Sequence, residues 1–431
     1  MRKSIKASLL ALLATTSAHT VWSAENTLAF TAATIIDGVS DAPIIDGTLI
    51  STNGRIVAVG PSESIEIPPE ARVIDLSGKT IMPGIINSHG HVGDVQGLES
   101  GHYTRDNLQR QLELYARYGV TTVNSLGNDE FEGFAIRNEQ DPLSQDRARL
   151  LVAGPVINAT TEDQARIAVR SIAAQSPNFI KIRVDDNLGR TPKMAPNIYK
   201  VIAEESEANN IPLAVHLYYL EDAKKSLAAG ADFIAHSVRD TLVDDELINA
   251  LKQANVCYSP TLTRELSTFV YEGEPFFFND PFFLREVAPQ DIATLRDSAR
   301  QKRIQQSASA QRYKNEALPN ALQNVKLLAD AGVRIAMGTD SGPAARFQGY
   351  FEHLEMHMMV EAGMTPMEVI KASTSVAADC LGLNYLGSLE QGYWSDIVVL
   401  EANPLDDIEN TKTISEVWIA GNPVPMDAGG M

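Results

Sequence analysis

The sequence predicts an α/β protein in which a (β/α)8 TIM barrel carries a small β-sandwich domain built from both ends of the chain. Three observations predict this fold. Short apolar runs alternate with helical patterns through the middle of the chain, as in βα units around a parallel sheet. β-rich runs broken by Gly-containing turns occupy both ends. The 431 residues, 44% of them hydrophobic, can bury a core of that size.

Residues 1–24 are predicted to form a signal peptide. Arg2, Lys3 and Lys6 precede an apolar stretch of about a dozen residues, and small residues follow near Ala24. The alternative is an N-terminal anchor helix, but the apolar run is shorter than the ~20 residues that a membrane span needs. We therefore expect a periplasmic or secreted protein that has no membrane contact after cleavage.

The β-sandwich is predicted from two separated parts of the chain, residues 25–82 and 385–431. The first part contains "TAATIIDGVSDAPIIDGTLISTNGRIVAVG" and "ARVIDLSGKTIMPG", in which DG, NG and SG turns separate short strands. The second part contains the similar runs "GYWSDIVVLEANP" and "ISEVWIAGNPV". The intervening residues 83–384 are assigned to the barrel.

Eight apolar runs are candidates for the barrel strands. They are residues 80–87, 120–126, 149–156, 178–184, 211–217, 231–237, 255–262 and 333–340. Catalytic groups of such barrels lie at the carboxyl ends of the strands, so polar residues there carry most weight.

Six side chains that could bind a metal lie in or directly after these strands. They are His89, His91, Lys181, His216, His236 and Asp340. A single histidine is more often part of a core, but six such groups at one barrel mouth predict a metal centre. Imidazole and carboxylate suit zinc, and a centre of two divalent ions would place them about 3.5–4 Å apart.

Lys181 is an unexpected member of this set. A protonated amine beside two dications is strongly disfavoured, so the lysine should be neutral, displaced or converted to an anion. A salt-bridged surface lysine is the alternative, but the apolar neighbours in "NFIKIRV" do not fit it.

Motifs along nearly the whole chain after the signal peptide resemble the amidohydrolase superfamily, in its imidazolonepropionase-like and prolidase-like branch. They include "VIDLSGKTIMPGIINSHGH", "FIKIRVDD", "AVHLYY", "IAHS", "GTDSG" and "GSLEQGYWSDIVVLEANPL". The family pattern usually opens Asp-x-His-x-His, whereas Asn87 stands at the first position here. This departure concerns the support of the ligands more than the ligands themselves.

The resemblance implies a ligand set for two divalent metal ions, with zinc as the expected metal. His89 and His91 would bind the more buried ion together with Asp340. Lys181, N6-carboxylated by CO2, would bridge both ions, and His216 and His236 would hold the second.

The predicted activity is hydrolysis of a C–N amide bond in a dipeptide or an N-acyl amino acid, as in a dipeptidase or carboxypeptidase. A metal-bridged hydroxide would attack and Asp340 would act as general base. A deaminase or cyclic-amide hydrolase on the same fold is the alternative, although Tyr219 stands where related deaminases carry a glutamate. A non-catalytic metal-bound binding protein is a further alternative, but structural zinc sites are usually closed by four ligands.

Four further residues are candidates for substrate binding. They are Tyr218, Arg183, Arg346 and His102. The tyrosine hydroxyl or an arginine could bind a substrate carboxylate, and each of the four could equally be structural. His353 and His357, four residues apart on a predicted helix, are interpreted as structural because no third ligand is apparent.

Residues 269–283 contain six of the thirteen phenylalanines. They could form a lid or apolar subsite over the active site, or pack against a second subunit of a homo-oligomer. The formal charge of −19 argues against nucleic acid as a partner. Cys257 and Cys380 are expected to be buried fillers, because two cysteines so far apart indicate neither a disulfide framework nor a thiolate zinc site.

Overall fold

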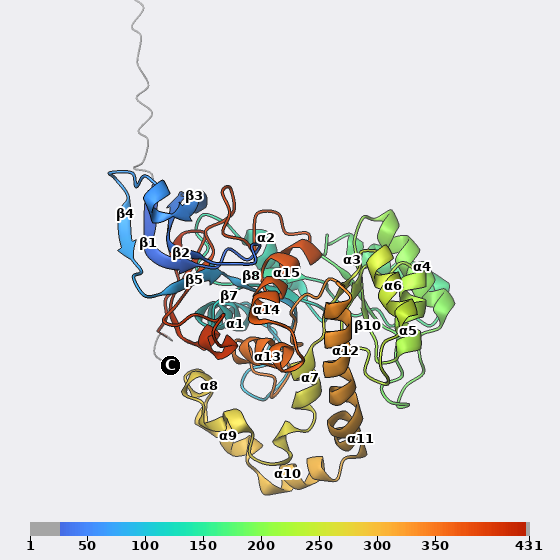
Figure 1. Cartoon of the computed structure of the whole chain (residues 1–431). Coiled ribbons are helices and arrows are strands. Elements are labelled where there is room, and N and C mark those ends of the chain that lie inside the picture. The colour runs from blue at the N-terminus through green and yellow to red at the C-terminus, as the bar shows by residue number, and fades with distance from the viewer. Residues whose placement is uncertain (1–25, 428–431) are drawn as a thin grey trace, which may run out of the picture.

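The computed structural model describes residues 26–427 (Figure 1). The predicted signal peptide lies outside this range. No helix within it is long and apolar enough to cross a membrane.

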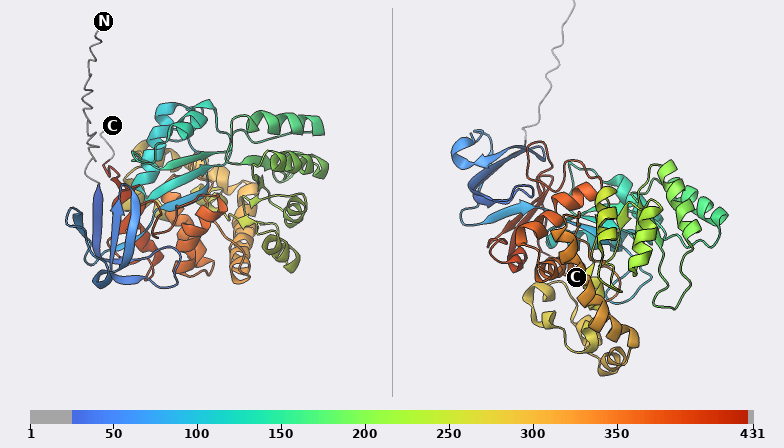
Figure 2. Two further views of the ribbon diagram at one scale, coloured as in Figure 1. Left: turned by 90° about the horizontal axis from the view of Figure 1, so that it is seen from above. Right: turned by 45° about the vertical axis from the view of Figure 1, so that its right-hand side comes forward.

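Both ends of the chain contribute strands to one mixed sheet of eight strands, in the order β15–β14–β13–β5–β1–β2–β3, with β4 beside β1. The N-terminal strands are β1 (Thr27–Ile35), β2 (Ile44–Thr52), β3 (Arg55–Pro61), β4 (Arg72–Asp75) and β5 (Thr80–Pro83). The C-terminal strands are β13 (Ile397–Leu400), β14 (Ile414–Ile419) and β15 (Asn422–Pro423). Figure 2 shows this sheet at one side of the molecule, away from the green helices.

Local turn chemistry and one cross-chain pairing explain this sheet. Asn53 and Gly54 both have positive φ, at 51° and 77°, which is the backbone of a tight hairpin turn between β2 and β3. Strand β5 pairs antiparallel with β13, so the two ends meet as predicted. The ladders form one sheet and do not confirm a sandwich. Apolar side chains of the eight-stranded sheet pack around Phe30 and Trp418, whose rings contact edge to face.

Two parallel sheets occupy the middle of the chain. One contains β6 (Ile85–Gly90), β7 (Val120–Ser125) and β8 (Arg149–Val152). The other contains β9 (Ile180–Arg183), β10 (Leu213–His216), β11 (Phe233–Ile234) and β12 (Cys257–Tyr258). The α/β class is therefore confirmed.

The predicted eight-stranded barrel is not a single closed sheet. Three isolated parallel bridges link its parts: Ile157 with Ile182, Tyr258 with Ile335, and Gly90 with Ser341. The last two bridges place residues 335–341 between β12 and β6, at the position of the predicted eighth strand. This segment forms no ladder of its own.

The first predicted barrel strand, residues 80–87, is in fact two strands with different partners. Strand β5 belongs to the terminal sheet, whereas β6 pairs with β7. Gly84 separates them, and a Cβ at this position would lie 2.1 Å from Oγ1 of Thr121. The apolar pattern could not reveal the break, because the side chains on both sides of Gly84 are buried.

Helices follow most of the parallel strands and cover them. They are α1 (Arg105–Arg117), α2 (Phe131–Glu139), α3 (Glu162–Ala173), α4 (Pro196–Ala208), α5 (Leu220–Ala228) and α6 (Asp245–Gln253). Side-chain oxygens of Thr104, Thr161 and Asp244 cap three of them by accepting hydrogen bonds from backbone N–H groups.

A long connection with several short helices follows β12. Figure 1 shows it as a yellow to orange segment, and we call it the arm. It contains α7 (Leu262–Ser267), α8 (Pro281–Leu284), α9 (Pro289–Leu295), α10 (Ser298–Gln305) and α11 (Ala308–Arg312). The chain continues with α12 (Leu318–Asp330), α13 (Tyr350–Glu361), α14 (Pro366–Ala372) and α15 (Ser375–Cys380).

The Phe-rich segment 269–283 is mostly a core of this arm. Phe277 and Phe283 are buried and contact the ring of Tyr350 on α13. Phe276 is the exception, with 66% of its surface exposed. The buried rings therefore face the chain's own helix, rather than a substrate or a second subunit.

Cys257 and Cys380 form a disulfide, so the prediction that both are unpaired fillers was wrong. Sequence distance misled the prediction, because 123 residues separate them while their Cα atoms lie 5.9 Å apart. The bond ties β12 to the end of α15.

Candidate metal centre

The structure brings His89, His91 and Asp340 together. Strand β6 carries His89, His91 follows it, and Asp340 ends the segment that bridges to β6. The Nε2 atoms of His91 and His89 lie 2.8 Å and 3.8 Å from Oδ1 of Asp340. One ligand atom of each residue lies within 4.8 Å of the others, so the three could hold one metal ion.

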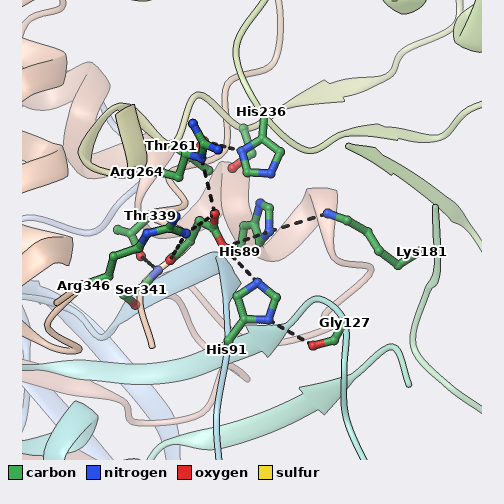
Figure 3. A network of polar contacts seen from close by, with 12 residues as sticks. His89, His91, Gly127, Lys181, His236, Thr261, Arg264, Thr339, Ser341 and Arg346 are labelled. Atoms are coloured by element: carbon green, nitrogen blue, oxygen red, sulfur yellow. Dashed lines mark hydrogen bonds and ion pairs between the residues drawn. The ribbon is translucent and has the colours of Figure 1, made fainter. Parts of the chain in front are cut away.

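Two of the other predicted ligands, Lys181 and His236, lie beside this group (Figure 3), and His216 lies next to His236. Nζ of Lys181, on β9, is 3.5 Å from Nε2 of His89. The His236 ring is centred 4.6 Å from the His89 ring and 4.1 Å from the ring of His216. All six predicted groups therefore converge, although they come from separate ladders.

Hydrogen bonds fix the orientation of two of these imidazoles. Nδ1 of His91 lies 2.9 Å from the carbonyl oxygen of Gly127, and Nδ1 of His236 lies 2.7 Å from Oγ1 of Thr261. Such partners leave Nε2 as the metal-binding atom. Thr261 has a left-handed backbone, with φ of 50°, as does Asp340 at 55°. Non-glycine residues adopt this conformation at a cost and often at functional sites.

Asn87 supports the site through a buried carboxylate. Its Oδ1 accepts from the backbone N–H of His89, and its Nδ2 donates to Oε1 of Glu352 over 2.6 Å. The same Oε1 accepts from the hydroxyls of Thr339 and Ser341, on either side of Asp340. Glu352 therefore ties β6 to the Asp340 segment, and no motif in the sequence indicated this role.

Burial controls the protonation of the candidate ligands. It lowers the pKa of His216 to about 3 and the pKa values of His89 and His236 well below the usual range. It also lowers the pKa of Lys181 to about 7, against the opposing attraction of Asp340. These three histidines are thus neutral, and a large fraction of Lys181 is neutral amine near pH 7.

Asp340 remains a carboxylate in the same environment. Burial raises its pKa, but the Arg346 guanidinium and then the His91 imidazole outweigh this and hold the pKa well below its usual range. Nδ1 of His89 is buried and has no hydrogen-bond partner among the described residues. Neutral imidazoles, an anionic carboxylate and an unpartnered ring nitrogen fit divalent cations of the zinc class.

The predicted substrate-binding residues have different surroundings. Arg346 donates from NH1 to Oδ2 of Asp340 over 2.6 Å, so it holds that carboxylate. Arg183 donates from Nε to Asp185 over 3.0 Å. Tyr218 is buried, and the imidazole of His102 makes no hydrogen bond within the described part of the chain.

Asp185 was not predicted as a site residue. Its Oδ2 lies 2.8 Å from Nε2 of His216, as an ion-pair contact without hydrogen-bond geometry. Burial opposes ionisation, but contact with His216 and attraction to Arg183 hold its pKa far below the usual range. The pair of acids in "IRVDD", directly after a barrel strand, was the available signal.

Two cavities are lined by residues that contact candidate ligands. One of about 680 Å³ lies beside Arg183 and Asp185 and is also lined by residues 156–160 and 191–195. The other, of about 620 Å³, lies between residues 95–99, the arm and the loop that contains Arg346. Each cavity therefore touches a residue that contacts a candidate ligand.

His353 and His357 take no part in the centre. The ring nitrogens of His353 lie 2.9 Å from Oγ1 of Thr411 and 2.8 Å from the carbonyl oxygen of Tyr118. His357 pairs with Glu409.

Solved structures of similar fold include amide-cleaving enzymes. A candidate prolidase from Bifidobacterium longum is 26% identical, with a TM-score of 0.75 over 93% of this chain and 94% of that one. A Xaa-Pro dipeptidase structure is 20% identical, with a TM-score of 0.73 over 92% of this chain and 99% of that one, which shows likeness of fold.

Curated relatives are more distant or partial. Ochratoxinase of Aspergillus niger is 27% identical over 62% of this chain and 51% of its own length, so the matched region spans about half of that relative. A 5-methylthioadenosine/S-adenosylhomocysteine deaminase of Caldicellulosiruptor saccharolyticus is 22% identical over 91% of this chain and 88% of that protein.

Residues 80–424 match the Amidohydrolase family as a whole. This range contains all six converging groups and most of the described chain. The chain therefore belongs to the amidohydrolase family.

Proposed function

We propose that the chain is an exported amidohydrolase with two divalent metal ions, zinc by expectation, that cleaves the amide bond of a dipeptide or an N-acyl amino acid. His89, His91 and Asp340 would hold one ion, and His216 and His236 the other. Lys181, carboxylated on Nζ, would bridge them.

The surroundings of Lys181 carry this proposal. The side chain is 3% exposed and has no carboxylate within 4.0 Å among residues 26–427. An amine in this position is costly as a cation. Reaction of the neutral amine with CO2 gives a carbamate anion and releases one proton, and two cations at the neighbouring imidazoles would accommodate this anion.

The chain's own residues supply the proton transfers. When bound, the cations would lower the pKa of a water molecule and polarise the substrate carbonyl. Oδ1 of Asp340 faces the imidazoles, so it can accept a proton there and return it to the leaving nitrogen. Arg346 holds the other oxygen and so fixes which one faces the reaction.

Two further observations support amide hydrolysis by an exported enzyme. Tyr219, at the position of the deaminase glutamate, donates its hydroxyl to Asp186 over 2.9 Å and so does not replace that acid. The disulfide between Cys257 and Cys380 suits an oxidising compartment outside the cytosol.

The test combines metal analysis of the purified protein with a hydrolysis screen of dipeptides, N-acyl amino acids and cyclic amides. We would compare wild type with Lys181→Ala and with the exposed control Lys200→Ala. About two zinc-class ions per chain, with amide cleavage lost only in Lys181→Ala, supports the proposal. One ion, with ammonia release from a heterocycle that survives Lys181→Ala, would assign the chain to the deaminases instead.

A further inference from the structure

Three arginines, one buried and two partly buried, lie close to the candidate metal centre, and we call them the arginine cluster. They are Arg239, Arg264 and Arg346. Nε of Arg239 lies 3.3 Å from Oε1 of Glu265, whose other oxygen accepts from NH1 of Arg264 over 2.8 Å. Figure 3 shows Arg264 and Arg346 approaching the histidines from the same side.

The arginine cluster carries one positive charge more than its carboxylate partners. Its ion pairs are with Glu265 and Asp340, so three guanidinium groups face two carboxylates. Buried charges are costly unless they are paired. Two divalent cations at the histidines would increase this excess, so the site as a whole favours one more anion.

A further acid, Glu355, does not balance the charge. It accepts hydrogen bonds from the backbone of Leu262 and from Thr263, and makes no ion pair with the arginine cluster. Burial raises the pKa of Glu355 to about 8, so this carboxyl is mostly protonated near neutral pH.

Arg264 is the member of the arginine cluster that is best placed to bind the missing anion. It lies on α7, three residues after Thr261, and its side chain is 13% exposed. Its guanidinium lies over the ring of Tyr313, 4.8 Å from the ring centre. Of its five N–H donors, one donates to Glu265 over 2.8 Å, and Tyr313 is the other side-chain partner, so most of the donors stay available.

The other arginines nearby are more fully hydrogen-bonded, less accessible or already neutralised. Arg346 donates from NH1 to Asp340 and from Nε to Ser267. Arg239 is 1% exposed and donates to the carbonyl oxygen of Ser237. Arg183 has 40% of its side chain exposed and is neutralised by Asp185, so it is the weaker receptor.

We propose that Arg264 binds a substrate carboxylate on the carbon next to the scissile nitrogen. This inference rests on the proposed function and specifies its substrate class: a dipeptide or N-acyl amino acid with a free α-carboxylate. That carboxylate is three bonds from the scissile carbonyl carbon, at most about 4 Å away. Nε of Arg264 lies 3.9 Å from Oδ2 of Asp340, so it is within reach of a substrate on which Asp340 acts.

The experiment compares an acid with its matched amide. The probes are the N-acyl amino acid or dipeptide that is hydrolysed fastest in the screen and its C-terminal carboxamide. Wild type, Arg264→Gln, Arg264→Lys and the exposed control Arg170→Gln are measured with each probe. Titration calorimetry of the product amino acid gives a second readout, and metal content and melting temperature show that each variant is folded and loaded.

We expect wild type and Arg170→Gln to prefer the acid by about 100-fold in kcat/KM, since a charge-assisted hydrogen bond would be lost with the amide. In Arg264→Gln this preference should fall to a few-fold, mainly because the KM for the acid rises, and the product amino acid should bind more weakly. Arg264→Lys should recover part of it. If Arg264→Gln does not fold, Arg264→Lys decides, because the lost bidentate geometry should still reduce the preference.

Three outcomes would overturn the inference. A folded, metal-loaded Arg264 variant that keeps the full preference for the acid excludes Arg264 as the receptor. Equal cleavage of acid and amide by wild type excludes carboxylate recognition while amide hydrolysis itself stands. Cleavage of no amide by wild type removes the proposed function, and this inference with it.

Discussion

The Arg346 guanidinium donates a 2.6 Å hydrogen bond to Oδ2 of Asp340, while Oδ1 of the same carboxylate faces the imidazole of His91. The two oxygens of Asp340 therefore have separate partners. One is oriented toward the candidate metal centre because the other is held by a fixed cation.

Replacing Arg346 should impair catalysis through Asp340. Arg346→Gln removes the strongest attraction that lowers the pKa of Asp340 against burial, so this pKa should rise. If the reaction needs the carboxylate unprotonated, the acid limb of the pH–rate profile should move to higher pH. We expect kcat to fall by about 10- to 100-fold, as for other residues that orient ligands.

Full pH–rate profiles of metal-loaded wild type and Arg346→Gln test this. Arg170→Gln, which removes an exposed arginine paired with Glu205, is the control for loss of a positive charge. An unchanged acid limb in Arg346→Gln would show that Arg346 does not govern Asp340.

Gly342 allows the loop after Asp340 to pass closely by His91. Its φ is +113°, and a Cβ there would lie 2.1 Å from the carbonyl oxygen of His91. Gly342→Ala should therefore displace Asp340 from His91, weaken metal retention and lower the stability by about 1–3 kcal/mol. Gly273→Ala is the control, since nothing lies within 4 Å of the position that its methyl group would take and its φ is not positive. Metal analysis and thermal unfolding of both variants test this. Equal metal content and equal melting temperatures for Gly342→Ala and Gly273→Ala would contradict the steric argument.

The candidate ligands could be predicted because each lies in or directly after a segment of simple apolar pattern. Parallel strands bring their carboxyl ends together, so His89, His216 and His236 converge without any knowledge of the loops. The supporting groups could not be found in this way. Glu352 lies on a helix and Asp185 in a loop, and only the folded backbone sets what they contact.

The errors in the prediction have the same origin. Cys257 and Cys380 meet because α15 packs beneath β12, a contact that no local pattern encodes. The strand break at Gly84 is hidden because both new strands are buried. For residues 269–283 the sequence left both a lid and a subunit contact open, and the structure adds that the buried rings of this segment pack on α13.

The disulfide between Cys257 and Cys380 should stabilise the folded chain. It closes a long loop, with 123 residues between the two cysteines, and so restricts the unfolded state. Reduction, or the double variant Cys257→Ala/Cys380→Ala, should lower the free energy of unfolding by about 2–5 kcal/mol. Thermal melts with and without reductant test this. The double variant serves as the control, because reductant should not change its melting temperature. If reductant also leaves the melting temperature of wild type unchanged, the bond does not stabilise the chain.

His353 should make the chain less stable in acid. Burial lowers its pKa to about 3, against about 6.5 in an unfolded chain. Between these values the unfolded chain binds a proton that the folded chain does not. The stability that this histidine contributes is therefore complete above pH 6.5 and is lost as the pH falls toward 3, by about 5 kcal/mol over the full window.

The neighbouring His357 provides a control of opposite sign. Its hydrogen bond with Glu409 raises its pKa, so its contribution is present at low pH and is lost as the pH rises. Urea unfolding from pH 8 to pH 4 should show a flatter acid loss in His353→Gln than in wild type, and a steeper one in His357→Gln. Equal slopes for wild type and His353→Gln would mean that His353 is charged in the folded chain, which its hydrogen bond to the carbonyl oxygen of Tyr118 alone would not prevent. The comparison of His353→Gln with wild type therefore tests whether burial keeps His353 neutral in the folded chain.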